Sequence, residues 1–194
     1  MNIAIVLFEG VEELDWVGPW EVLSAWMHNW PDDGVGVYTV GWTTGPITCA
    51  KGARVLADHT WATAPPPEVV IWPGGRGTRP MLGDEAVRER VRGLAAAGAL
   101  MTSVCTGSLV YADAGLLDGR PATTHWSSLV LLGELGTDIE VEADARYVDD
   151  GDVVTAAGVS AGIDMALHLV ARLQSRERAA EVRRYIQYDP APPV

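Results

Sequence analysis

The sequence predicts an α/β fold with a mostly parallel central sheet. Short apolar runs bounded by turn residues alternate along the chain with segments whose apolar residues repeat at helical spacing. The apolar runs are hydrophobic on both faces, as are strands of a parallel sheet that helices cover on both sides. With 194 residues, of which 48% are hydrophobic, the chain has the size of one ordinary domain, so we expect residues 1–194 to form a single domain.

Four buried strands are expected, in chain order. They are residues 3–8, 35–42, 69–72 and 99–104, each of which is short and largely apolar. In an open parallel sheet, ligands bind outside the carboxyl ends of the strands. The loops that follow these strands are therefore where functional side chains are to be sought.

Helical segments follow the strands. Asp84 is expected to cap a helix in which Val87, Val91 and Leu94 recur on one face, and Gly98 to end it.

The C-terminal part of the chain carries two more helical patterns. An apolar repeat predicts a helix over 163–174, and a charged helix is expected over 176–184. The segment 189–194 is rich in proline and is expected to be extended.

The charge balance argues against two classes of partner. Acidic residues number 26 against 14 basic ones, so the formal net charge is −12. Phosphate backbones and anionic membrane surfaces would repel such a chain. We therefore expect neither nucleic acid nor a membrane as a partner.

Cysteine and histidine usage argues against a disulfide scaffold and a metal centre. The two cysteines, Cys49 and Cys105, cannot build a disulfide framework, and the first apolar run follows no basic region. Both observations favour a cytoplasmic protein. No apolar run approaches the roughly 20 residues of a spanning helix, so no membrane segment is expected. The four histidines lack ligand spacing and nucleotide-binding motifs are absent, so we expect no metal and no cofactor.

The segment from Ser103 to Ser108 is the most informative motif. Cys105 follows an apolar strand, precedes a helical segment, and is flanked by the small residues Ser103 and Gly107. This is the pattern of a nucleophile elbow with cysteine in the nucleophile position. A thiol at a helix N-terminus is expected to favour its thiolate form. The alternative is a buried core cysteine.

Carboxylates follow the first strand. Asp15 lies between Leu14 and Trp16, so burial is expected to raise its pKa enough for proton transfer. The alternative is that Asp15 caps a helix over 19–26, and the neighbouring Glu12 and Glu13 are further candidates.

Two further loops supply candidate pocket residues. In the turn 73–77, the backbone N–H of Gly75 would form an oxyanion hole with the N–H of Thr106. His125 ends a short strand in 122–126 and would either activate Cys105 or serve a structural role.

Arg76 lies in the first of these loops. Trp16 and Trp126 flank candidate residues and would form the walls of an apolar pocket.

Together these motifs resemble the PfpI / class I glutamine amidotransferase-like superfamily, and within it the isonitrile hydratase branch. The resemblance covers nearly the whole chain. Transcription regulators with an attached helix-turn-helix domain share part of it, and we do not expect that domain here. The matching segments are 14–15, 18–19, 73–75, 103–109, 122–126, 161–164 and 190–193.

The resemblance implies a flavodoxin-like three-layer sandwich, a homodimer, and no metal or organic cofactor. It also implies hydration of an isonitrile to an N-substituted formamide through a thioimidate on the cysteine. By the same resemblance Cys105 is the nucleophile, Asp15 is the acid/base group, and Thr106 is a neighbour on which activity depends.

The chain departs from the pattern at three positions. Arg76 and Arg79 stand where small residues are expected, and Val17 stands where a hydroxyl residue is common. Two charges at the pocket mouth would favour an anionic or polar substrate. Other cysteine-dependent activities, such as amide hydrolysis or glyoxalase chemistry, and a non-catalytic thiol sensor of oxidants or ligands remain the alternative functions.

Overall fold

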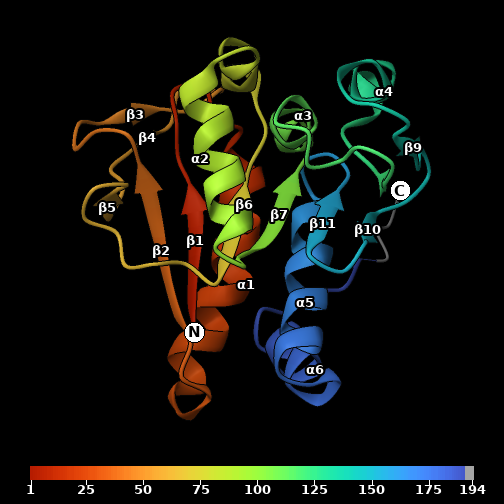
Figure 1. The fold of residues 1–194 in the computed structure, drawn as a ribbon. Coiled ribbons are helices and arrows are strands. Elements are labelled where there is room, and N and C mark those ends of the chain that lie inside the picture. Colours follow the sequence, from red (N-terminus) through yellow and green to blue (C-terminus); the bar gives the residue numbers. More distant parts are fainter. Residues whose placement is uncertain (191–194) are drawn as a thin grey trace.

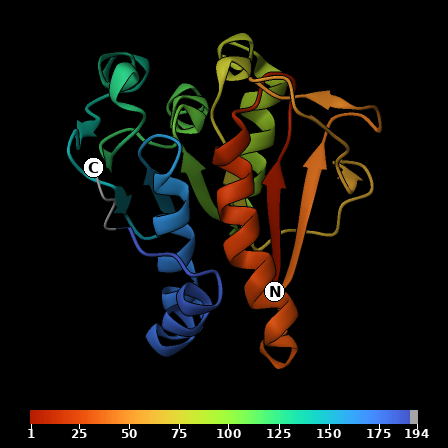
Figure 2. The same ribbon diagram turned by 180° about the vertical axis from the view of Figure 1, so that it is seen from behind.

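In the computed structural model, which describes residues 1–190, a seven-stranded sheet lies between two layers of helices (Figures 1 and 2). The strand order is β10-β11-β7-β6-β1-β2-β5, and every neighbouring pair is parallel except β10 with β11. The predicted α/β class and the mostly parallel sheet are thus confirmed. The strands of this sheet are β1 (Asn2–Val6), β2 (Gly36–Gly41), β5 (His59–Thr60), β6 (Val69–Trp72), β7 (Leu100–Val104), β10 (Tyr147–Asp149) and β11 (Val153–Ala156).

Helices cover both faces of the sheet. One face carries α1 (Glu13–Asn29), α5 (Ala161–Leu173) and α6 (Arg176–Tyr185), which lie in front in Figure 2. The other face carries α2 (Glu85–Ala96) and α3 (Gly107–Asp113), with α4 (Leu129–Leu135) packed beside α3. Short elements in the connections are β3 (Ile47–Thr48), β4 (Arg54–Val55), β8 (Pro121–Ala122), β9 (Glu140–Val141), and the 3-10 helices η1 (Pro31–Asp33), η2 (Arg76–Met81) and η3 (Trp126–Ser128).

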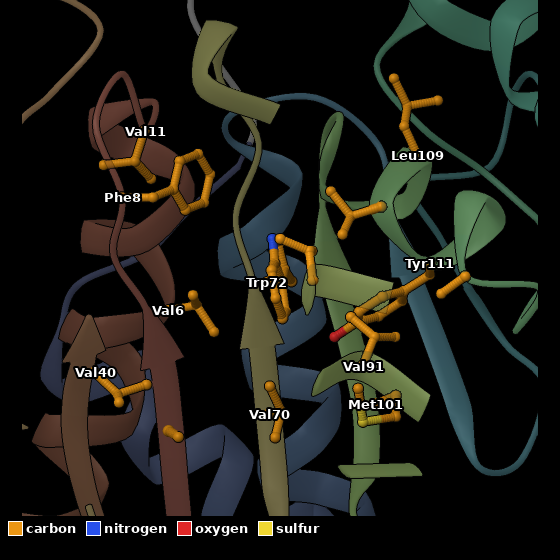
Figure 3. Packing of buried hydrophobic residues seen from close by; sticks show 14 of the residues in the cluster. Val6, Phe8, Val11, Val40, Val70, Trp72, Val91, Met101, Leu109 and Tyr111 are labelled. Carbon is orange, nitrogen blue, oxygen red and sulfur yellow. The ribbon is translucent and has the colours of Figure 1, made fainter. Parts of the chain in front are cut away.

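Two hydrophobic cores form because successive side chains of each strand point to opposite faces. Ile3 and Ile5 of β1 belong to the core under α1 and α5. Val6, Trp72 and Tyr111 belong to the core on the opposite face, which Figure 3 shows from close by. The four predicted strands are therefore buried on both sides and correspond to β1, β2, β6 and β7.

The predicted helices after the third strand and near the C-terminus are confirmed as α2, α5 and α6. Asp84 caps α2, since its side chain accepts a hydrogen bond of 2.9 Å from the N–H of Ala86. The predicted extension of 191–194 lies outside the described residues.

Helix α1 differs from the expected helix over 19–26. It begins six residues earlier, and Pro19 lies in its interior. Glu12, rather than Asp15, occupies the N-cap position. A Cβ at Gly18 would lie 3.0 Å from Ile163, so the missing side chain lets α1 approach α5 closely. The proposed capping role of Asp15 is therefore wrong.

Within residues 1–190, no helix combines the length and the apolar character that crossing a bilayer would require.

Candidate active site

Cys105 lies between the end of β7 and the start of α3. Figure 1 shows this junction at the carboxyl edge of the sheet. Its φ is 55°, in the left-handed region, and its N–H donates to the carbonyl oxygens of Ala156 and Ala157 at 3.0 Å. A Cβ at Gly107 would collide with the carbonyl oxygen of Trp72, so only glycine allows α3 to start so close to β6. This geometry is consistent with the predicted elbow.

The carboxyl group of Asp15 lies beside this thiol, although 90 positions separate the two residues in the sequence. Asp15 is 0% exposed, and its Oδ2 accepts a hydrogen bond of 2.8 Å from the N–H of Gly74. Its Oδ1 receives no hydrogen bond of good geometry within residues 1–190. One oxygen is thus fixed, and the other is open to exchange a proton.

Burial sets the protonation of both groups. It raises the pKa of Asp15 from 3.8 to about 7, while the hydrogen bond from Gly74 and the neighbouring thiol oppose this rise. It also raises the pKa of Cys105 from 9.0 to about 12, and the negative charge of Asp15 adds to the rise. The expectation that the helix N-terminus favours a thiolate is therefore wrong, because desolvation and a neighbouring carboxylate outweigh the hydrogen bonds from the N–H groups of Thr106 and Val159.

The backbone of Val159 completes the surroundings of the pair and was missed at the sequence level. Val159 has a φ of 51°, an uncommon conformation for a β-branched residue. Its N–H lies against both Cys105 and Asp15, where it lowers the pKa of each group. Val159 lies in the loop between β11 and α5. The short apolar run of β11 was the sequence signal that could have located this loop.

Thr106 is buried and ties the glycine-rich turn to the nucleophile. Its Oγ1 accepts a hydrogen bond of 3.0 Å from the N–H of Gly75 and lies 3.1 Å from the hydroxyl of Thr78. The N–H of Thr106 faces the sulfur of Cys105, where it lowers the pKa of the thiol. The expected oxyanion hole is therefore not open, because the Gly75 donor is already occupied.

A pocket of about 290 Å³ lies above Cys105. Arg76 and Arg79, two of the three predicted departures, lie at this pocket, together with the hydroxyl groups of Ser127 and Ser128, which sequence reasoning did not find. Its lining consists of Glu12, Gly75, Arg76, Arg79, Cys105, Thr106, His125, Ser127, Ser128 and Val159.

His125 lines the pocket without pairing with the cysteine. Its Nδ1 lies 2.8 Å from the hydroxyl of Ser127, and no hydrogen bond joins its ring to Cys105 within residues 1–190. As N-cap of η3, it also accepts from the N–H of Ser127. The structure thus brings His125 to the pocket but does not form the Cys–His pair considered above.

The two tryptophans are not pocket walls. Trp126 is 77% exposed, and neither it nor Trp16 is among the lining residues. The indole of Trp16 instead faces the sulfur of Cys49, which is fully buried in the turn between β3 and β4. Burial raises the pKa of the Cys49 thiol. Both predicted wall positions are wrong because these side chains pack elsewhere or point outward.

The remaining carboxylates of the first loop have other partners. Glu12 forms an ion pair with Lys51, and Glu13 accepts a hydrogen bond of 2.8 Å from the backbone N–H of Lys51. Of the carboxylates in this segment, Asp15 is the one whose pKa is affected by contact with the Cys105 thiol. Within residues 1–190, no group of three or more His, Cys, Asp or Glu side chains is placed to hold a metal ion.

Comparisons with known proteins agree with the fold and the motifs. The sequence model of the DJ-1/PfpI family matches residues 1–172. Isonitrile hydratase from Pseudomonas putida is 39% identical over 193 residues, which cover 100% of this chain and 81% of that protein. The crystal structure of a THiJ/PfpI family protein from Pseudomonas syringae has a TM-score of 0.88 and 33% identity, covering 100% of this chain and 77% of that one.

Regulatory proteins also contain a similar region. The HTH-type transcriptional regulator GbdR of Pseudomonas aeruginosa is 31% identical over 146 residues, which cover 74% of this chain and 38% of the regulator. A family match over most of the chain, together with these relatives, shows that the chain belongs to the DJ-1/PfpI family.

Proposed function

We propose that this protein is an isonitrile hydratase that converts an isonitrile, R–N≡C, to an N-substituted formamide with Cys105 as nucleophile and Asp15 as acid and base. One observation carries the proposal: a buried carboxyl group with a pKa of about 7 lies beside a neutral thiol below a small pocket. The 39% identity to an isonitrile hydratase supports the same reaction.

The first half of the reaction adds a thiol to the isonitrile carbon. That carbon is a weak electrophile, so it must receive a proton as it accepts the sulfur. Ionised Asp15 takes the thiol proton while the S–C bond forms and then delivers this proton to the same carbon. The product is the thioimidate R–N=CH–S on Cys105, and Asp15 is again ionised.

The second half adds water. The water oxygen bonds to the thioimidate carbon while Asp15 takes one proton from the water. Asp15 then passes this proton to the nitrogen. The resulting R–NH–CH(OH)–S adduct collapses when the C–S bond breaks and the hydroxyl proton returns to the sulfur through Asp15. One carboxyl group thus serves both halves, which requires a pKa near neutrality.

The hydrogen bonds of the site favour this reaction over acyl transfer. Amide hydrolysis through an acyl-enzyme needs free N–H donors for the developing oxyanion. Here the Gly74 donor is occupied by Asp15 and the Gly75 donor by Thr106. Addition to an isonitrile needs no such donors, because a proton neutralises the charge that develops on carbon.

The neutral state of the Cys105 thiol argues against a function as a thiol sensor of oxidants. Oxidation follows thiolate character and exposure. Cys105 is 5% exposed and its pKa is raised to about 12, so the reactive form is scarce until a substrate and Asp15 draw the proton away.

A substrate panel tests the proposal. Purified protein is given cyclohexyl isocyanide, a primary amide or methylglyoxal in separate reactions, and products are identified by NMR. The proposal expects N-cyclohexylformamide from the first reaction only. Hydrolysis of the amide or conversion of methylglyoxal, with no formamide, would overturn it.

A further inference from the structure

We infer that the substrate is an isonitrile that carries an anionic group, which the guanidinium groups of Arg79 and Arg76 bind at the pocket mouth. This inference rests on the proposed function and narrows its substrate class. The group that fits is a carboxylate, because a planar guanidinium matches its two oxygens.

Arg79 is fixed by neutral groups, which leave its charge uncompensated. Its Nη1 donates to Thr78 Oγ1 at 3.0 Å, and its Nη2 donates to Ser128 Oγ at 3.1 Å. Both hydroxyl residues are buried, so the side chain is held in place. Within residues 1–190, neither Arg79 nor Arg76 has a carboxylate partner within ion-pair distance, and Arg76 also lines the pocket.

Within residues 1–190, six basic residues have no ion-pair partner, and Arg79 differs from the others in being held by buried hydroxyl groups at the pocket. With 26 acidic and 14 basic residues, most arginines can find a carboxylate nearby. Eight basic side chains do so, namely Lys51, Arg88, Arg92, Arg120, Arg146, Arg172, Arg178 and Arg183. Among the lining residues the carboxylate is that of Glu12, and Lys51 already pairs with it. The pocket mouth is therefore net positive in a molecule whose total charge is −12.

A chain of hydroxyl groups connects Arg79 to the nucleophile. Thr78 contacts Arg79 at 3.0 Å and Thr106 at 3.1 Å, and Thr106 follows Cys105 directly. An anion bound by Arg79 is therefore held at a set position relative to the sulfur. Since the pocket has a volume of about 290 Å³, the carboxylate and the isonitrile must belong to one small molecule.

Two substrates that differ in one charge test the inference. The kcat/KM values for isocyanoacetate and its methyl ester are measured on the wild-type protein and on Arg79→Gln. Charge-assisted hydrogen bonds contribute about 1.5–3 kcal/mol, which corresponds to roughly 10-fold to 100-fold. We expect the wild type to prefer the anion by at least about tenfold, and Arg79→Gln to remove this preference by slowing the anion alone.

Arg176→Gln is the matched control. Arg176 is exposed on α6, away from the pocket, and its replacement changes the net charge by the same amount. Arg176→Gln is expected to keep the preference for the anion over the ester. Arg76→Gln removes a charge that is less firmly held, so it is expected to reduce this preference less than Arg79→Gln does.

Three outcomes would overturn the inference. Hydration of both compounds with equal kcat/KM would overturn the substrate class and leave the proposed function standing. An equal loss for anion and ester in Arg79→Gln would mean that Arg79 acts only by holding Thr78. Hydration of no isonitrile at all would overturn the proposed function, and the substrate class with it.

Discussion

At the scale of single residues, the site depends on a carboxyl group and a thiol that share one region of low polarity. Burial opposes the charged form of each group, and a charge on Asp15 further opposes a charge on Cys105. Above a pH of about 7 the pair therefore holds a carboxylate and a thiol, which is the form that starts the proposed reaction.

Replacement of the carboxyl group tests this form of the pair. In Asp15→Asn we expect kcat/KM to fall by about 10²-fold to 10⁴-fold, because a positioned acid/base is lost. In the wild type, kcat/KM should fall as the pH drops below about 7, since a protonated Asp15 cannot accept the thiol proton. The neighbouring Glu13→Gln variant should keep both the rate and this acid limb. A wild-type rate, or an unchanged acid limb, in Asp15→Asn would contradict the assignment.

The same residue is expected to reduce stability at neutral pH. The pKa of Asp15 is raised in the folded state, so the folded protein binds more protons than the unfolded chain between pH 3.8 and about 7. Stability therefore falls as the pH rises through this window, by about 4 kcal/mol in total. Asn carries no charge to desolvate, so the free energy of unfolding of Asp15→Asn should increase relative to that of the wild type as the pH rises.

Urea unfolding of both proteins at about pH 5 and about pH 8 measures this effect. Between these two pH values, the free energy of unfolding of Asp15→Asn should rise relative to that of the wild type by roughly 3 kcal/mol. A stability difference that does not change with pH would show that Asp15 titrates normally.

Sequence reasoning found Asp15 and Cys105 because each has a local signal: a carboxylate among apolar residues and a thiol between a strand and a helix. It predicted the wrong direction for the thiol pKa because the burial of Cys105, and secondarily the charge of Asp15, come from distant parts of the chain that pack around the thiol. It missed Val159 because this residue acts through its backbone N–H and because β11, the strand before its loop, was not predicted.

At the scale of elements, close approach of backbones holds the site together. Gly107 starts α3 directly against the end of β6, where any side chain would meet the carbonyl oxygen of Trp72. This contact sets the distance between the turn at Gly74 and the cysteine. A Cβ at Gly74 would in turn lie 2.8 Å from Asp15 Oδ2.

A pair of Gly→Ala variants tests this packing. Gly107→Ala should lower the free energy of unfolding by about 1–3 kcal/mol or more, because backbone must move to make room. Gly93→Ala is the matched control, since Gly93 is exposed in the middle of α2 and a Cβ there would meet nothing within 4 Å. It should raise stability by up to about 1 kcal/mol. Equal effects of the two variants in denaturant unfolding would contradict the packing argument.

Elements with strong local patterns were predictable, and those with weak or conflicting patterns were not. The helix over 19–26 was placed too late because Gly18 and Pro19 read as the start of a helix, whereas tertiary packing against α5 carries α1 through them. The strand β11 was not predicted, although turn residues bound its apolar run, with Asp150 and Gly151 before it and Gly158 after it.

At the scale of the whole molecule, alternation of strands and helices was enough to predict the fold class. It does not specify the strand order, which places β7 between β6 and β11. That order brings the first turn of α1, which carries Asp15, together with the connections that carry Gly75, Cys105 and Val159. That functional residues gather at the carboxyl edge of the sheet could be predicted, but which side chains meet there depends on the strand order.

The charge distribution belongs to the same scale. A net charge of −12 repels an anionic substrate at long range, whereas the pocket mouth carries the charges of Arg76 and Arg79. Recognition of an anion in this protein is therefore a property of the pocket and not of the overall field. The resemblance to related enzymes also leads us to propose a homodimer, which light scattering in solution would test.

The proposed reaction requires that Cys105 carry the substrate covalently during turnover. The most direct test is intact-protein mass spectrometry of samples quenched in acid while cyclohexyl isocyanide is being consumed, followed by peptide mapping. We expect a mass increase equal to one isonitrile molecule, located on Cys105, and neither adduct nor formamide with Cys105→Ala. Formamide production at the normal rate by Cys105→Ala, or an adduct on another residue, would contradict the proposed reaction.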